Sequence, residues 1–239
     1  MQYKTAAQII ARVQRETDTE DEAGGDEFIR AAEWLDWIND GVDEAEAIIH
    51  KLGAEDEYFL KTGNISLVSG DNTYSLPTDI YANKIKRVIY VNGTTVITVK
   101  RMRGESRFED AQIIASGGTG VQEYGYILTN TSAASGVIMN LYPTPGETVS
   151  NGLRVWYIRN ANAVAATTDT VDLPEFYTFL YAFLKWKVES KANPGSPLAE
   201  SAKIEYLEQR KLMEETLTDM VPDEDNRIIP DLTFYKEMN

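Results

Sequence analysis

The chain has 239 residues, of which 43% are hydrophobic, enough to bury a sizeable core in one larger domain or two small ones. It has no cysteine, which excludes disulfides, thiolate zinc sites and cysteine nucleophiles. Its formal net charge of −15 disfavours nucleic-acid binding by the average surface, because phosphates require clustered Lys and Arg. No apolar run approaches the ~20 residues that span a bilayer, and the first residues lack the apolar segment of a signal peptide. We therefore expect a protein used in solution on the cytoplasmic side, without a membrane partner.

The N-terminal part predicts two helices. Residues 3–16 carry apolar side chains at helical spacing. Residues 17–27 are acidic and contain glycines, which is typical of a solvated connector, and their spacing does not fit an EF-hand calcium loop. A second helix is predicted over 26–52, with Asp26 as its N-cap and Gly53 as its stop.

Apolar residues of this second helix alternate in steps of three and four, the pattern of a helix packed lengthwise on other helices. The predicted buried stripe is Phe28, Ala31, Leu35, Ile38, Val42, Ala45, Ile49 and Leu52. Trp34, Trp37 and Ile48 lie off this stripe. They extend the core or provide a second contact, to another subunit.

Residues 64–160 are predicted to form a mostly antiparallel β-domain. The predicted strands are 64–69, 73–76, 85–91, 94–99, 121–130, 136–143 and 152–160. Asn92-Gly93 predicts a hairpin between two of them. Pro77 ends a strand or lies at an edge, and Asp79 is suited to an Asx-turn.

Helical periodicity then returns, and a tail ends the chain. Pro174 suits a first helical turn, and residues 176–186 form an aromatic face. Ser196 is placed to cap a last helix that runs to about Met220. The predicted fold class is α+β: a helical bundle from residues 1–62 and 172–221, an inserted, mostly antiparallel β-domain at 63–171, and an extended C-terminal tail at 222–239.

No pattern of catalytic, metal-ligating or cofactor-binding residues stands out, so no enzyme is predicted. His50 is the single histidine and has no cysteine or second histidine to act with. Residues 117–120 have the glycines of a phosphate loop but neither its G-K-[ST] ending nor a following helix. A glycosidase, which needs only a pair of carboxylates, remains an open alternative, because acidic pairs are abundant in so acidic a chain.

Two stretches are candidates for contact with partners. A basic cluster at the open ends of the predicted hairpin either balances the acidic surface or forms a docking patch for an acidic surface or for passing DNA. It comprises Lys84, Lys86, Arg87, Lys100, Arg101, Arg103 and Arg107. The tail has large apolar groups that its own domain has no obvious way to bury, and we expect them to dock in a groove of a neighbouring subunit or of another partner protein unless the tail has no role. Its docking candidates are Ile228, Ile229, Pro230, Leu232, Phe234 and Tyr235.

The order of several short motifs resembles that of the head-to-tail adaptor (connector) proteins of tailed bacteriophages, particularly short-tailed ones. The motifs cover roughly residues 5–220, and the tail follows no pattern of the family. They are W-x-x-x-I-N-D-G (Trp34 to Gly41), Y-x-L-P-x-D (Tyr74 to Asp79), L-Y-P-x-P (Leu141 to Pro145), V-W-Y (Val155 to Tyr157) and D-T-V-D-L-P-E (Asp169 to Glu175).

The resemblance implies a structural virion protein in the neck between head and tail, assembled in the host cytoplasm. It implies a ring, a dodecamer, that binds the portal protein and the tail or nozzle proteins after genome packaging. Double-stranded DNA would pass through the lumen without specific binding, which an acidic surface permits. Two alternatives remain: a tail or host-recognition protein that binds carbohydrate through exposed aromatics, and an enzyme such as a cell-wall hydrolase, which requires an essential carboxylate.

Overall fold

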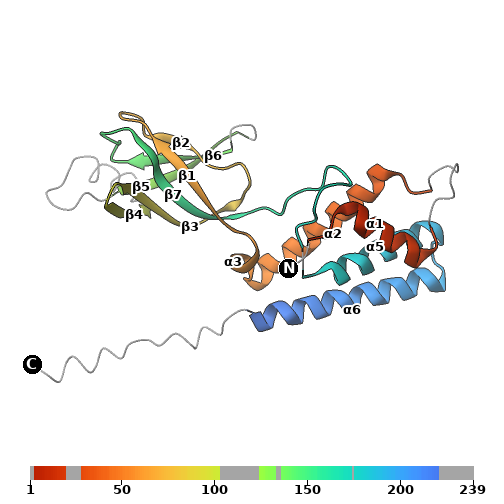
Figure 1. The fold of residues 1–239 in the computed structure, drawn as a ribbon. Coiled ribbons are helices and arrows are strands. Elements are labelled where there is room, and N and C mark those ends of the chain that lie inside the picture. Colours follow the sequence, from red (N-terminus) through yellow and green to blue (C-terminus); the bar gives the residue numbers. More distant parts are fainter. Residues whose placement is uncertain (1–2, 20–27, 103–123, 133–135, 174, 221–239) are drawn as a thin grey trace, which may run out of the picture. The chain divides into compact units, whose positions relative to one another are not determined.

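The chain has an α+β fold, seen in a computed structural model that describes residues 3–19, 28–102, 124–132, 136–173 and 175–220 (Figure 1). The polypeptide divides into two compact units. One, here called the helical unit, is drawn from residues 1–54 and 161–239. The other, the sheet unit, is drawn from residues 55–160. The polypeptide thus enters the sheet unit once and leaves it once.

In the helical unit, α5 packs against each of the other three labelled helices (Figure 1). These helices are α1 (Ala6–Thr17), α2 (Ala31–Leu52), α5 (Tyr177–Ala192) and α6 (Pro197–Met220). The central position of α5 explains its aromatic composition, because it is covered on several sides. Among the described helices, none is both long and apolar enough to cross a membrane.

Local sequence signals set several helix ends. Thr5 accepts a hydrogen bond from the Gln8 backbone while the Gln8 side chain accepts one from the Thr5 backbone, a complete capping box at α1. Gly53 ends α2 in the left-handed conformation, with φ of 77°, as predicted. The Ser196 hydroxyl accepts a hydrogen bond from the Ala199 backbone, which confirms the predicted cap of α6.

The prediction for α2 was wrong in its start and in part of its buried face. The helix begins at Ala31 and not at residue 26; Asp26 lies outside the described residues. Phe28 is 50% exposed and Leu35 is half-buried, whereas Trp34 and Ile48 are buried. The buried face is therefore rotated from the predicted stripe toward Trp34, the side that also carries Gly41, where Leu180 and Phe183 of α5 approach closely.

Gly41 lets α2 and α5 approach closely. A Cβ atom at this position would lie 2.6 Å from Cδ1 of Leu180 and 3.0 Å from Cδ1 of Phe183. Both of those side chains are buried and have little room to move. The glycine that ends the W-x-x-x-I-N-D-G motif is therefore required by packing.

The sheet unit contains a seven-stranded sheet in the order β1-β7-β3-β4-β5-β6-β2. Its strands are β1 (Leu60–Leu67), β2 (Thr73–Ser75), β3 (Ile80–Asn92), β4 (Thr95–Arg101), β5 (Tyr124–Ser132), β6 (Gly136–Tyr142) and β7 (Val149–Arg159). A short helix, α3 (Glu55–Tyr58), precedes β1. All seven predicted strands are present, and β3 and β4 form the predicted hairpin.

One strand pair departs from the antiparallel prediction. β4 and β5 pair in parallel, with Lys100 opposite Gly125. A parallel pair needs a long connection, and residues 102–123 provide it. Sequence patterning identifies strands but not their neighbours, so it did not predict this pairing.

The inward side chains of all seven strands meet in one core, around which the sheet curls. They include Leu67, Tyr74, Val88, Val99, Tyr126, Met139, Leu141 and Val155. Tyr90 and Tyr124 stack in this core with ring centroids 4.8 Å apart. Most aromatic residues of the sheet are therefore buried structural groups.

Candidate interaction surfaces

The polar residues of the W-x-x-x-I-N-D-G motif on α2 have structural partners within the helical unit. The Asn39 amide donates to the Val164 carbonyl at 3.0 Å and accepts from the Val164 amide at 2.8 Å. The Asp40 carboxylate pairs with Lys187 at 3.4 Å. The motif from Trp34 to Gly41 thus joins α2 to α5 and to the segment that follows the sheet unit, and none of these contacts indicates a reaction.

Asp79 connects two motifs that are distant in sequence. Its carboxylate accepts a hydrogen bond from the Tyr157 hydroxyl at 2.9 Å and one from Lys61 at 2.7 Å. The predicted Asx-turn role is therefore replaced by a link between strands. Partial burial raises the pKa of Asp79, but the hydrogen bonds from Lys61 and Tyr157 outweigh it and leave the pKa below its ordinary value.

The basic cluster predicted at the hairpin is divided by the structure. Lys84 lies 3.1 Å from a carboxylate oxygen of Glu55, and Lys86 lies 2.8 Å from one of Asp56. Burial lowers the pKa of Lys86, but the hydrogen bond to Asp56 outweighs it, so its pKa is raised. These two lysines bind acidic groups of α3 and supply less charge to the surface than their number suggests.

The remaining predicted cations lie in different environments. Arg87 and Lys100 are exposed, whereas Arg101 is half-buried at the end of β4. Arg103 and Arg107 lie outside the described residues, as do the tail residues 222–239. The predicted docking roles of these groups stay predictions.

The outward face of the sheet adds Arg154, which the sequence did not single out, and Trp156, which it named only within the V-W-Y motif. Strand register places Arg87 opposite Trp156, and Ile89 opposite both Arg154 and Thr98. Arg154 is exposed, and its guanidinium lies 6.0 Å from the centroid of the Trp156 ring. Alternation along β7 could have shown that these side chains face away from the core, but only the register places them beside Arg87.

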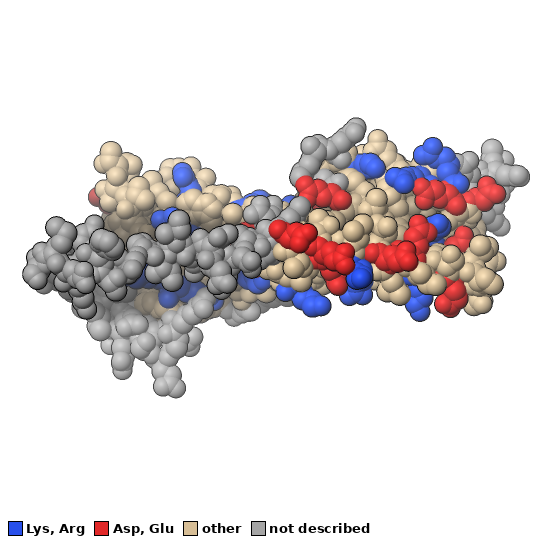
Figure 2. Space-filling view, turned by 90° about the horizontal axis from the view of Figure 1, so that it is seen from below, with Lys and Arg blue, Asp and Glu red and all other residues tan. Residues whose placement is uncertain are grey.

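Acidic and apolar side chains lie together on the outward side of α6. Four of the nine large hydrophobic side chains exposed among the described residues belong to this helix: Leu198, Ile204, Leu207 and Leu212. Exposed carboxylates of Glu200 and Glu208 accompany them. Figure 2 shows acidic side chains gathered over the helical elements. Such a mixed surface is typical of protein contacts.

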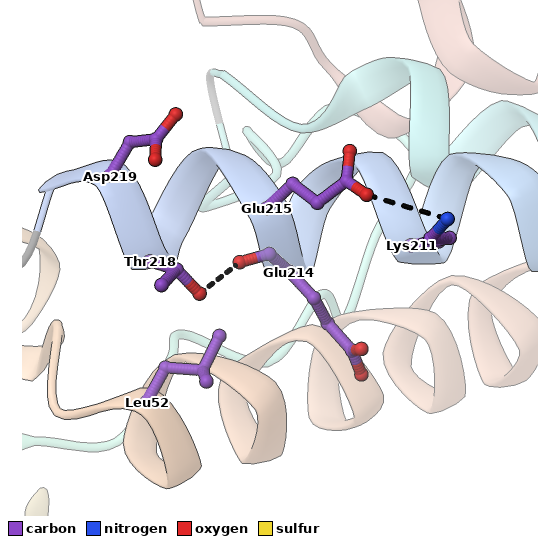
Figure 3. A pocket seen from close by; sticks show the side chains of 6 residues that line it. All are labelled: Leu52, Lys211, Glu214, Glu215, Thr218 and Asp219. Carbon is purple, nitrogen blue, oxygen red and sulfur yellow. Dashed lines mark hydrogen bonds and ion pairs between the residues drawn. The ribbon is translucent and has the colours of Figure 1, made fainter.

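A hollow of about 360 Å³ lies between the ends of α2 and α6 (Figure 3). Its lining residues are Leu52, Lys211, Glu214, Glu215, Thr218 and Asp219. Lys211 pairs with Glu215 at 3.5 Å, and the Thr218 hydroxyl donates to the Glu214 carbonyl at 2.8 Å. The lining thus combines internal helix contacts with an acidic surface, and it offers no distinct chemistry.

The buried histidine has a local role. The His50 Nε2 atom lies 3.4 Å from Glu46 Oε1, which also accepts a hydrogen bond from the Ala161 amide at 3.2 Å. Within the part of the chain that the structure describes, no group of three or more His, Asp or Glu side chains could hold a metal ion. His50 and Glu46 therefore belong to the packing of the helical unit.

The contacts above pack and link elements among the described residues, and the exposed basic, acidic and apolar surfaces are candidates for binding other macromolecules. The SU10 adaptor protein family matches residues 4–227, and the chain belongs to this family. The match confirms the resemblance to phage head-to-tail adaptors and indicates no enzyme family. None of the curated proteins compared with the chain matches it.

Proposed function

We propose that this protein is a structural virion component that joins the capsid portal to the tail as a homo-oligomeric ring. It completes the head after genome packaging and forms part of the channel through which DNA leaves. The family match over residues 4–227 carries the proposal. The ring is a dodecamer, and the protein catalyses no reaction.

The distribution of charge supports a lumen that does not retain DNA. Residues 55–160 contain ten acidic and ten basic residues, so the rest of the chain carries the whole net charge of −15. A DNA duplex next to the helical unit would meet few cations and release few counterions. DNA could therefore slide past this surface without a stable complex.

The two compact units are proposed to act as separate domains. The helices form one bundle, and the sheet unit is an insertion between them. The predicted limits were residues 1–62 with 172–221 for the helical domain and residues 63–171 for the β-domain. The boundaries between the compact units lie instead near residues 54 and 161. Residues 164–171 support the boundary near residue 161, because they form hydrogen bonds with Asn39 and with the start of α1.

The tail and the basic hairpin residues are proposed as contacts with assembly partners. The apolar groups between Ile228 and Tyr235 would each contribute about 1.5–3 kcal/mol if a portal groove buried them. Lys100, Arg101 and Arg103 would meet an acidic partner surface in a salt-dependent way. Neither contact is required for the fold of the subunit.

The test is attachment of the purified chain to DNA-filled, portal-containing particles that lack neck proteins. We expect the chain to co-sediment with the particles, to add a ring visible by electron microscopy, and to protect the packaged genome from nuclease. Capsids without a portal are the matched control and should bind nothing. Equal binding to both kinds of capsid, or to neither, would overturn the proposal.

Deletion of residues 222–239 tests the tail in the same assay. The truncated chain should keep its melting temperature as a monomer and lose stable attachment to the particles. Attachment equal to that of the full chain would show that the tail has no docking role.

A further inference from the structure

We propose that neighbouring copies of this chain bind through two different, complementary surfaces: the outward sheet face of one copy and the outward face of α6 of the next. The sheet face consists of Arg87, Val91, Val96, Lys100, Arg154 and Trp156, around the buried Ile89. The α6 face consists of Glu200, Ile204, Leu207 and Glu208. This inference names the subunit contact of the proposed ring, and it rests on that proposed function.

The sheet face combines positive charge with apolar surface. Arg87 and Arg154 are exposed, and neither forms an ion pair with another described residue. Between and beside them lie Trp156, which is half-buried, and Val96, which is 61% exposed. None of the described residues at outward positions in 87–91, 96–100 and 154–158 is acidic.

The α6 face combines exposed apolar surface with acidic groups; Lys211, one turn beyond Leu207, also lies on it and pairs with Glu215. Ile204 is 57% exposed and lies on the side of the helix opposite the buried Tyr206 and Met213, and Leu207, which is 46% exposed, lies beside it one turn further along. Glu200 and Glu208 lie one turn before and one turn after Ile204, and no ion pair among the described residues includes either one. An apolar centre with an acidic rim fits an apolar centre with a basic rim.

The charge distribution favours a second copy of this chain as the occupant. The acidic excess of the chain lies outside residues 55–160, so a cationic face in the sheet unit finds its complement on the helical unit of another molecule. A contact between two different patches is heterologous. Repeated copies then form a closed ring where the rotation between subunits permits closure.

The experiment reverses charge on each face and then mixes the variants. One variant carries Arg87→Glu and Arg154→Glu, and the other carries Glu200→Lys and Glu208→Lys. Each alone should lose the assembled species in sedimentation velocity, because like charges then face one another. Mixed in equal amounts, they should assemble again, because every contact in an alternating ring is then between opposite charges.

A matched control carries Asp36→Lys and Asp43→Lys, the same change of charge on exposed positions of α2. It should assemble like the wild type. Circular dichroism and thermal unfolding must show that each variant is folded. Assembly of the wild type should weaken as salt rises.

Several results would overturn this interface. They are a wild-type chain that stays monomeric at its highest soluble concentration, single-face variants that assemble normally, and a mixture that does not recover assembly. Loss of binding to a DNA duplex in the arginine variant, with assembly unchanged, would assign the sheet face to nucleic acid instead. Recovery of assembly in the mixture, without attachment of the wild-type ring to portal particles, would retain the interface and reject the proposed function.

Discussion

The helical unit and the sheet unit differ in their balance of acidic and basic residues. In the sheet unit, acidic and basic residues are equal in number, and Lys61, Lys84 and Lys86 each bind a carboxylate of the same unit. In the helical unit, acidic residues outnumber basic ones, and much of the excess lies on the surface of the helices. The sheet unit is therefore close to neutral, whereas the helical unit carries the net negative charge although several of its cations also pair with carboxylates.

The two units also differ in how they build a core. The sheet unit encloses side chains from seven strands in one cluster. The helical unit depends on close approach at Gly41 and on an aromatic group, in which Tyr206 stacks on Trp186 with centroids 5.1 Å apart and packs edge-on against Phe183. Substitutions that affect one unit and not the other can test this difference.

The largest effect is expected from loss of an aromatic side chain in the helical core. Phe183→Ala should lower the free energy of unfolding by about 3–5 kcal/mol, because a buried ring is replaced by a cavity. Denaturant unfolding followed by tryptophan fluorescence measures this change. Leu35→Ala is the comparison and should cost clearly less, because Leu35 is half-buried. Equal losses would contradict the buried face described for α2.

A smaller loss is expected when the contact between α2 and α5 is overfilled. Gly41→Val should cost about 1–3 kcal/mol, because the new side chain would clash with Leu180 and Phe183. Ala47→Val places the same residue on the exposed side of α2, where its cost is the lower helix propensity of Val relative to Ala. The difference between the two melting temperatures reports the packing effect. Equal melting temperatures of the two variants would contradict the close packing inferred at Gly41.

In the sheet unit, Tyr157→Phe should cost about 1 kcal/mol, since it removes one hydrogen bond from the Asp79 carboxylate. The loss is modest because the Asp79 side chain is 32% exposed, so water can replace the hydroxyl. Urea unfolding of the variant at neutral pH measures the loss. Tyr126, whose substitution by Phe leaves Asp79 untouched, offers a comparison within the same core.

The lowered pKa of Asp79 predicts how the stability of the fold depends on pH. The pKa of Asp79 in the folded chain lies below its ordinary value of 3.8, so its contribution to stability is present above that pH and is lost as the pH falls through the folded pKa. Asp79→Asn should therefore be less stable at neutral pH and should lose less on acidification. A parallel acid profile in the variant would show that other carboxylates dominate.

The smallest effect is expected from salt. Added sodium chloride should stabilise the helical unit slightly, because it screens repulsion among the excess carboxylates, and should change the balanced sheet unit less. Hydrogen exchange of amides in α6 and β7, compared at low and moderate ionic strength, separates the two responses. A larger salt effect in β7 than in α6 would reverse the expected difference between the units.

Local signals in the sequence were sufficient for most elements. Alternating apolar residues predicted the seven strands, Asn92-Gly93 predicted the hairpin, and Ser196 predicted the start of α6. These features depend on residues within a few positions of one another, where backbone preference and capping decide the structure. The order of short motifs likewise predicted the adaptor family.

Tertiary structure decided which residues meet across long separations. Packing of α2 against the other helices determined that Trp34 is buried while Leu35 is only half-buried. Strand order brought Tyr157 to Asp79, 78 residues earlier in the chain, and placed Arg154 near Arg87. The sequence determined the elements because propensity and periodicity are local, whereas these contacts depend on which surfaces pack together, and many pairings have similar local patterns.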